Sequence, residues 1–134
     1  MKDNQALIVV DVQKDFLETG ALPVNDGSQV VPVSNRISPK FKHVVFTQDW
    51  HPQGHISFAS SHLGKAPYST IDVSYGKQVL WPEHCVQNTV GAEFADGLNT
   101  ENGACFVKKG AHSDIDRYSA FLEAARKTKP DLGV

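Results

Sequence analysis

The chain has 134 residues, and its 13 lysines and arginines stand against 15 aspartates and glutamates, which gives a formal charge of −2. This near-neutral balance favours neither nucleic acid nor an anionic membrane as a partner. With 40% hydrophobic residues, 10 glycines and 7 prolines, the composition is that of an ordinary globular chain, which we interpret as a single domain over residues 1–134.

The apolar runs and the cysteines indicate the compartment. The apolar stretch Ala6–Val10 ends at Asp11 and is too short for a membrane span or for the apolar core of a secretion signal. The two cysteines, Cys85 and Cys105, make no disulfide framework, so both are expected as thiols. We therefore predict a cytoplasmic protein that is not membrane-bound.

The elements in chain order predict an α/β fold with a parallel sheet. Residues 6–12 and 43–48 are apolar, β-branched runs without alternation, which is typical of strands buried on both faces. Between them, apolar residues at roughly helical spacing predict a helix: Val30, Val31, Val33 and Ile37. Pro32 fits only its first turn. Residues 104–108 predict a third strand.

Two further segments surround these elements. Residues 52–103 show no sustained period and many turn formers, and such a long irregular excursion usually builds a site or a lid. From about Asp116 to Lys127, apolar residues on one face predict a last helix that ends before Pro130.

Polar residues follow each predicted strand, at the edge where loops of α/β sheets bind ligands. They are Asp11, then Asp49 and His51, then Lys108 and Lys109. Asp11 is desolvated after an apolar strand and is either a general base near neutral pH or a cap for residues 13–16. Lys109 either holds a charge beside Asp11 or is a solvated lysine, and Lys108 then faces the other way.

The Asp49-x-His51 pair has the spacing of metal ligands. Side chains alternate along a strand, so both lie on one face, and a carboxylate with an imidazole suits Zn²⁺ or another first-row ion. A third ligand has to come from elsewhere, and the candidates are His55 and His84. A surface or capping role for the pair is the alternative.

A nucleophile is harder to find. Cys85 lies beside His84 in a Trp-Pro loop, but free cysteines are more often buried hydrophobes than nucleophiles. Cys105 lies in a predicted core strand, which makes it the weaker candidate.

Several motifs in order resemble the nicotinamidases (pyrazinamidases) of the isochorismatase-like cysteine hydrolases, over essentially the whole chain. The strings are Asp11-Val-Gln-Lys-Asp-Phe16, Gly20-Ala-Leu22, Thr47-Gln-Asp-Trp-His-Pro52, His55-Ile-Ser-Phe-Ala59, Leu80-Trp-Pro-Glu-His-Cys85, Lys109-Gly110 and Asp116-Arg-Tyr-Ser-Ala-Phe121. The resemblance implies a three-layer isochorismatase-like α/β fold. It also implies a metal-dependent amidase that converts nicotinamide, and pyrazinamide, to nicotinate and ammonia for NAD salvage.

The same resemblance implies roles for individual residues. In an Asp–Lys–Cys triad, Asp11 takes the thiol proton and Lys109 supplies the cation. Asp49, His51 and His84 bind a divalent metal, with zinc first and iron or manganese as alternatives, and His55 is a secondary ligand candidate. The metal orients the pyridine substrate. The ring pocket is formed by Phe16, Leu22, Trp81 and Tyr118.

One departure from the family pattern concerns the nucleophile. The family's cysteine lies in an Ala-Thr-Asp-Tyr-Cys turn beyond the Tyr-Ser-Ala-Phe motif, and this sequence ends at Val134 before such a segment. Cys85 matches a non-nucleophilic position. We therefore expect the N-terminal portion of such a hydrolase domain, inactive on its own. In the family strand order 3-2-1-4-5-6, this portion leaves the flank of the first strand open as an apolar edge.

Two other interpretations stay open. One is a short paralogue that binds metal or a pyridine without turnover, completed by another subunit. The other is a different small-amide hydrolase of the same superfamily. Assembly into a homo-oligomer is compatible with each of them.

Overall fold

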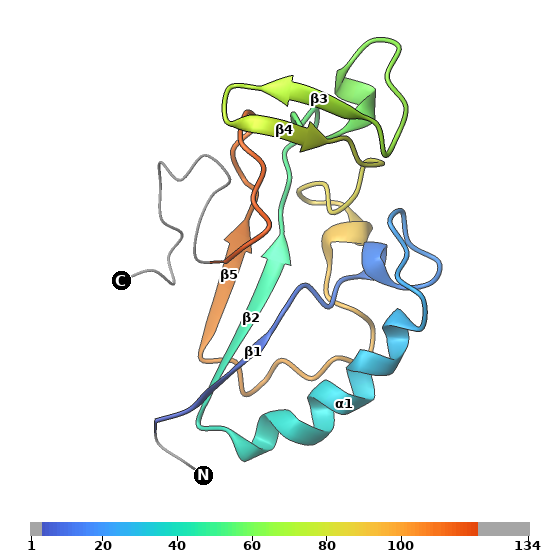
Figure 1. Ribbon diagram of the computed structural model, residues 1–134. Helices are drawn as coiled ribbons and strands as arrows, with labels where there is room; N and C mark the ends of the chain where they lie inside the picture. Colours follow the sequence, from blue (N-terminus) through green and yellow to red (C-terminus); the bar gives the residue numbers. More distant parts are fainter. Residues whose placement is uncertain (1–3, 121–134) are drawn as a thin grey trace.

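The computed structural model describes residues 4–120, in which a three-stranded parallel sheet carries one α-helix on its flank (Figure 1). The sheet order is β1-β2-β5, formed by β1 (Ala6–Val9), β2 (His43–Asp49) and β5 (Cys105–Lys109). The helix α1 (Val30–Ile37) connects β1 to β2. Single 3-10 turns lie at Lys14–Phe16, Gly27–Gln29, Ser38–Lys40, Ala59–Ser61 and Val90–Ala92. The predicted parallel α/β fold is confirmed.

The observed strand ends differ slightly from the predicted ones. β1 stops at Val9 rather than at residue 12, because the chain turns at Asp11, whose φ of 51° lies in the left-handed region. Aspartate tolerates this conformation better than the β-branched residues beside it. The turn directs the Asp11 side chain across the end of the sheet, toward β2 and β5.

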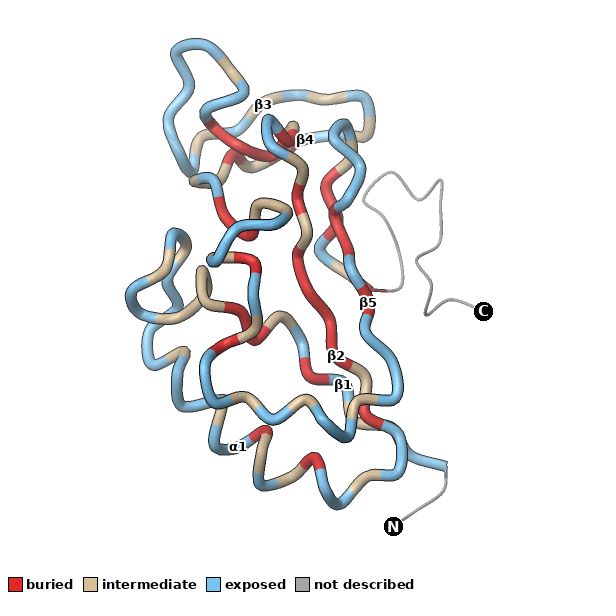
Figure 2. The backbone as a smooth tube through the Cα atoms, turned by 180° about the vertical axis from the view of Figure 1, so that it is seen from behind, coloured by how far each residue is buried: buried red, intermediate tan, exposed pale blue. Residues whose placement is uncertain are grey.

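The core lies beneath the central strand. Figure 2 shows β2 as a nearly continuous buried segment, and Val44 and Phe46 in it are fully buried. Val9, Val12 and Ala95 complete the buried cluster, against which half-buried apolar side chains pack. The β2–β5 register places Asp49 opposite Lys109. Packing of this strand therefore fixes the two residues on which the site depends.

The outer edge of β1 is open within residues 4–120, where β1 pairs with β2 alone. Ile8 is 37% exposed and Val10 is 59% exposed. Next to this edge lies a groove of about 460 Å³ with largely apolar walls that include Val12, Leu17 and Val24. The predicted apolar edge is therefore present in the part of the chain that the structure covers.

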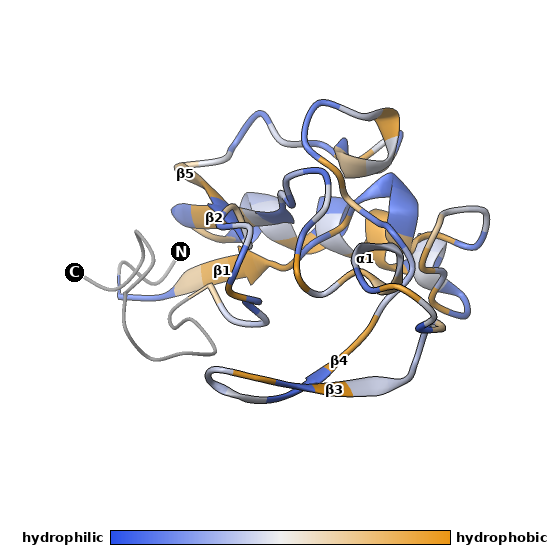
Figure 3. Ribbon diagram, turned by 90° about the horizontal axis from the view of Figure 1, so that it is seen from above, coloured by the Kyte–Doolittle hydropathy of each residue, from blue (hydrophilic) through white to orange (hydrophobic). Residues whose placement is uncertain are grey.

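Residues 52–103 contain an antiparallel hairpin that the sequence analysis missed. Strands β3 (Thr70–Val73) and β4 (Gly76–Val79) join through the two residues Ser74 and Tyr75. Seen from above, the hairpin lies to one side of the main sheet (Figure 3). The alternation of Ile71 and Val73 with polar residues was the available signal for it.

The helix predicted from Asp116 does not begin there. Residues 116–120 have no helical structure, because the Asp116 amide donates to the Tyr75 hydroxyl (3.1 Å) and the Arg117 amide to the Asp116 carboxylate (2.8 Å). The rest of that prediction lies outside the described residues. In residues 4–120, no helix combines the length and the apolar character that crossing a membrane requires.

Candidate active site

A cavity of about 230 Å³ lies at the carboxyl ends of the parallel strands. Its lining includes the residues to which the family resemblance assigned a catalytic, metal-binding or ring-binding role, with the exception of the secondary candidate His55: Asp11, Phe16, Leu22, Asp49, His51, Trp81, His84, Lys109 and Tyr118. Within residues 4–120, these residues come from the ends of the three parallel strands, from the segments that follow those strands, and from the loop after the β3–β4 hairpin. The structure thus brings the assigned residues together at one place, the end of the sheet where such folds bind ligands.

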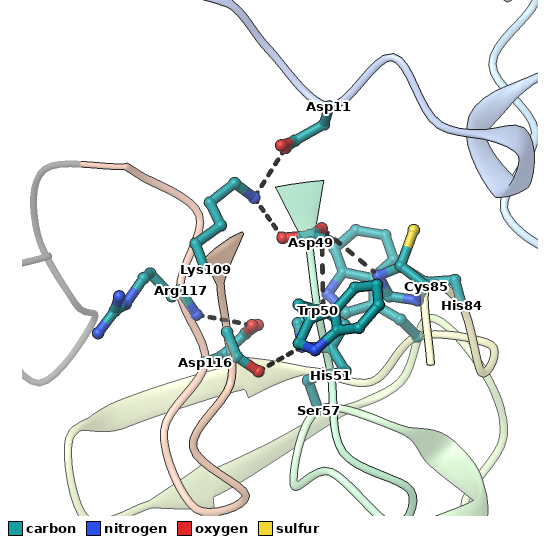
Figure 4. A network of polar contacts seen from close by, with 12 residues as sticks. Asp11, Asp49, Trp50, His51, Ser57, His84, Cys85, Lys109, Asp116 and Arg117 are labelled. Carbon is teal, nitrogen blue, oxygen red and sulfur yellow. Dashed lines mark hydrogen bonds and ion pairs between the residues drawn. The ribbon is translucent and has the colours of Figure 1, made fainter. Parts of the chain in front are cut away.

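Lys109 joins the carboxylates of Asp11 and Asp49 (Figure 4). Its ammonium lies 2.7 Å from Asp11 Oδ2 and donates to Asp49 Oδ1, and the residue is only 2% exposed. The Thr47 hydroxyl donates to the other Asp11 oxygen over 2.6 Å. Lys108 points away from this cluster, as the strand alternation predicts, and its ammonium nitrogen lies 3.6 Å from the centre of the Trp50 ring.

The two carboxylates have different proton affinities. Burial raises the pKa of Asp11, with Lys109 opposing it and Asp49 adding to it. Burial acts on Asp49 in the same direction, but the neighbouring His51, whose Nε2 lies 3.7 Å from Asp49 Oδ2, and the Lys109 charge hold the Asp49 pKa at about 2. Burial opposes the charge of Lys109, yet Asp49 and Asp11 raise its pKa. Asp11 is therefore the carboxylate suited to exchange protons, and Asp49 the permanent anion.

Asp49, His51 and His84 form a set of metal-ligand type. Asp49 Oδ2 lies 3.7 Å from His51 Nε2 and 3.9 Å from His84 Nε2. In a tetrahedral zinc site with bonds of about 2.0–2.1 Å, donor atoms are about 3.3 Å apart. For the two distances that start at Asp49 Oδ2, closing around an ion thus needs a shortening of roughly half an ångström.

The hydrogen bonds behind both imidazoles also fit a metal. His51 Nδ1 lies 3.0 Å from the Gly110 carbonyl, and His84 Nδ1 lies 2.7 Å from the Pro82 carbonyl. A carbonyl can only accept, so each Nδ1 carries a proton, and in the neutral form of each ring Nε2 presents its lone pair to the space beside Asp49. Burial also lowers the pKa of His84, which favours the neutral ligand form. The residues present therefore suit a divalent ion.

Gly110 is required by the position of His51. Its φ is +67°, and a Cβ atom there would lie 2.4 Å from His51 Cε1. No side chain can be accommodated at this position without moving the imidazole ring. The glycine after Lys109 is thus part of the construction of the site.

His55 lies behind His51 and does not line the cavity. Its ring is 4.3 Å from the His51 ring, its Nδ1 is 2.7 Å from Ser57 Oγ and its Nε2 is 3.2 Å from the Ile115 carbonyl. Burial and then the neighbouring His51 lower the His55 pKa to about 4. Although His51, His55 and Asp116 have ligand-type atoms within 4.8 Å of one another, both His55 nitrogens already have partners. We therefore assign His55 to the support of His51.

Neither cysteine lines the cavity in the described part of the chain. Cys85 is fully buried, its amide donates to Asp15 Oδ2 (2.7 Å), and burial raises the pKa of its thiol well above the ordinary value. An inert thiol of this kind agrees with its non-nucleophilic place in the motif. The expectation that Cys105 lies in the core was wrong, because it begins the edge strand β5 and is exposed.

Two cavity residues were quoted in a motif but received no role from the sequence. Asp116 and Arg117 both line the cavity and are 3% and 8% exposed. Charged side chains are rarely buried this deeply without a purpose. The string Asp116-Arg-Tyr-Ser-Ala was the signal for them, but its apolar spacing also predicts a helix, and a residue in a surface helix has no indicated role.

Comparisons with known proteins agree with this geometry. The isochorismatase domain matches residues 5–130, so the chain belongs to that family. A nicotinamidase of Acinetobacter baylyi is 51% identical over 97% of this chain and 61% of its own length. The chain thus spans about three fifths of the length of the first curated relatives that it matches.

Solved structures extend the likeness to three dimensions. A nicotinamidase/pyrazinamidase of Acinetobacter baumanii superposes with a TM-score of 0.96 at 48% identity, over 98% of this chain and 64% of that one. A pyrazinamidase of Pyrococcus horikoshii in complex with zinc gives a TM-score of 0.65 at 39% identity, over 87% and 57%.

Proposed function

We propose that this protein is a nicotinamidase that hydrolyses nicotinamide to nicotinate and ammonia in the cytoplasm, and so returns the pyridine ring to NAD synthesis. The observation that carries the proposal is that one cavity is lined by the proposed base, the lysine, the three proposed metal ligands and the proposed ring-pocket residues. The similarity to proteins named nicotinamidase supports it.

In the proposed reaction, Asp11 is the base. It takes the proton of a cysteine thiol, the thiolate attacks the amide carbon, and ammonia leaves with the proton that Asp11 held. Water then hydrolyses the thioester to nicotinate and restores the thiol. Lys109, fixed between Asp11 and Asp49, offsets the negative charge of the base and keeps it oriented. The thiol has to come from outside residues 4–120, because neither cysteine there lines the cavity.

Asp49, His51 and His84 would hold the metal. We propose zinc first, in view of the zinc in the Pyrococcus horikoshii structure, with iron and manganese as alternatives. A bound ion would supply a Lewis-acid partner for the pyridine nitrogen and so orient the ring.

The ring pocket consists of aromatic and aliphatic walls. The Trp81 indole donates to the Tyr118 hydroxyl over 3.1 Å, and Phe16 lies 5.6 Å from the His84 ring, centre to centre. Leu22 adds an apolar surface. A flat heteroaromatic amide, nicotinamide or pyrazinamide, fits such a slot better than an aliphatic amide does.

The test is nicotinamide-dependent release of ammonia. We would assay residues 1–134 alone, the product of the gene's full reading frame, and a chimera in which residues 1–134 precede the remaining portion of the Acinetobacter baylyi nicotinamidase. We expect turnover by the longer proteins, a loss of about 10²-fold or more in their Asp11→Asn variants, and no change in Cys85→Ala. Folded, zinc-loaded longer proteins that release no ammonia from nicotinamide would sink the proposal.

A non-catalytic metal- and pyridine-binding protein is the second candidate. It is favoured by the absence of a cysteine from the cavity lining within residues 4–120. Nicotinamide binding without turnover, in a zinc-loaded full reading-frame product, would select it. Equal turnover of aliphatic amides would instead indicate another small-amide hydrolase.

A further inference from the structure

Gln78 is a buried amide that does not line the cavity and has received no role so far. It lies in β4, is 2% exposed, and uses both ends of its side chain. Its nitrogen, which has two hydrogens to share, lies within hydrogen-bond distance of three acceptors: the Val79 carbonyl (2.7 Å), Asp116 Oδ2 (2.8 Å) and the Tyr118 hydroxyl (3.1 Å). Its oxygen accepts from the Tyr75 hydroxyl over 2.9 Å.

These bonds tie the hairpin to the segment that closes one side of the cavity. Tyr75 lies in the two-residue connection between β3 and β4, and its hydroxyl also accepts from the Asp116 amide over 3.1 Å. The Asp116 carboxylate in turn accepts from the Arg117 amide (2.8 Å). Residues 116–118 have no regular structure of their own, so side chains of the hairpin supply hydrogen bonds that a helix or strand would otherwise give.

The same network reaches the aromatic wall. The Tyr118 hydroxyl accepts from Gln78 on one side and from the Trp81 indole on the other, both over 3.1 Å. Tyr118 and Trp81 both line the cavity, whereas Gln78 stands behind them. The position of the Tyr118 ring relative to Trp81 therefore depends on a residue that itself makes no contact with the cavity.

We propose that Gln78 is a positioning residue that holds the Asp116–Tyr118 segment against the β3–β4 hairpin. It thereby fixes the position of the Tyr118 ring relative to Trp81, and so the shape of the pocket wall that a flat pyridine amide contacts. The part of this inference that concerns the pyridine amide rests on the proposed function. At this position, the amide both donates to the Asp116 carboxylate and accepts from Tyr75. A carboxylate would repel Asp116, and a thioether of similar length would form neither bond.

The experiment compares wild type with Gln78→Met and Gln78→Glu, and uses Gln48→Met as the matched control. Gln48 is also a buried amide that donates to a backbone carbonyl, Ala92 at 3.0 Å, but it does not line the cavity or contact the hairpin network. Amide hydrogen exchange at Asp116 and Arg117 reports the network directly, because the Tyr75 hydroxyl accepts from the first amide and the Asp116 carboxylate accepts from the second. Titration with nicotinamide measures the effect on the Trp81–Tyr118 wall, and titration with zinc measures separately whether the metal ligands are disturbed.

For Gln78→Met we expect at least tenfold faster exchange at both amides and about tenfold weaker nicotinamide binding, with zinc affinity within twofold of wild type. Gln78→Glu should show the same defects at pH 7.5 and a partial recovery, relative to wild type, at pH 5.5, where the introduced carboxyl can carry a proton. Gln48→Met should match wild type in exchange and binding.

Two results would overturn the inference: unchanged exchange at Asp116 and Arg117 in Gln78→Met, or unchanged nicotinamide affinity in a variant whose exchange is accelerated. If wild type itself does not bind nicotinamide, the proposed function fails. The exchange rates then still decide whether Gln78 holds the segment.

Discussion

The two sides of Asp11 are built differently. On the side of β2 and β5, its carboxylate meets Thr47 and Lys109, and Lys109 also reaches Asp49, so the buried charges have partners. On the side of the β1 edge, the groove is apolar, and Val10 is 59% exposed. The side toward β2 and β5, here called the inner side, is a preorganised polar site. The side toward the β1 edge, the outer side, is an apolar surface against which further groups could pack.

This contrast separates two requirements of the proposed chemistry. The inner side provides the groups that orient a substrate and balance charge, and these are held by strand register and by backbone carbonyls behind each imidazole. A reacting thiol has to approach Asp11 from elsewhere. The open groove, which Asp11 also lines, is a free approach to that carboxylate within residues 4–120.

The largest effect is expected from Lys109→Met. Without the ammonium, the Asp11 and Asp49 carboxylates face each other unpaired in a buried site, so we predict a loss of about 3–5 kcal/mol in the free energy of unfolding. Urea denaturation measures it. Lys108→Met is the matched control, and we expect it to lose at most about 1 kcal/mol with the Trp50 contact. Equal losses of stability in the two variants would contradict the claim that Lys109 stabilises the fold by pairing with Asp11 and Asp49.

His55 should make stability depend on pH. It stays neutral in the folded protein down to about pH 4, whereas the unfolded chain takes up a proton near its ordinary pKa of 6.5. The contribution of neutral His55 to the free energy of unfolding is therefore fully present above pH 6.5. It is lost as the pH falls toward 4, and the loss is at most about 3 kcal/mol. Denaturation midpoints between pH 7.5 and 4.5 measure this loss. His55→Asn should flatten the curve, and a curve of unchanged slope would refute the assignment.

Gly110→Ala tests whether the metal ligand His51 depends on the close approach of the Gly110 backbone. The new methyl group would meet the His51 ring, so we predict zinc affinity reduced about tenfold or more. Gly54→Ala has a similar φ of +74° and nothing within 4 Å of its Cβ, so it carries the backbone cost of about 1–2 kcal/mol without the clash. Zinc titration of both variants separates the effects. Equal zinc affinities would show that the close approach does not matter.

The smallest effect on stability is expected at the open edge. Val10→Lys places a charge on an exposed apolar position beside β1, and we predict less self-association of residues 1–134 with a change of about 0.5 kcal/mol or less in unfolding. Sedimentation at several concentrations measures this. Leu63→Lys, fully exposed in a loop away from the sheet, should not alter association. An equal effect of both substitutions would indicate a general charge effect and not an edge.

The sequence predicted most of the site residues that lie at the ends of the parallel strands. Apolar runs determine burial, burial determines the register, and the register places Asp49 against Lys109, so the residues at the strand ends could be selected in advance. The alternation along the strands also predicted that Asp49 and His51 share a face and that Lys108 faces away from Lys109.

What the sequence could not reveal depends on contacts between distant segments. Asp116 is buried because Gln78 and Tyr75 bind it from a hairpin about 40 residues earlier, and no local pattern encodes that pairing. The same contacts outweigh the helical spacing at residues 116–120. The support of His51 and His84 by backbone carbonyls was equally hidden, because it depends on where loops pass.

The most direct test of the central claim is a zinc titration of the protein and of its His84→Ala variant, with His62→Ala as the control. His62 lies outside the cavity lining and binds the Ile56 carbonyl. The account predicts one zinc ion per chain, an affinity reduced about 100-fold or more in His84→Ala, and wild-type binding in His62→Ala. Equal zinc affinity in the two variants, or no stoichiometric binding by the folded wild type, would contradict it.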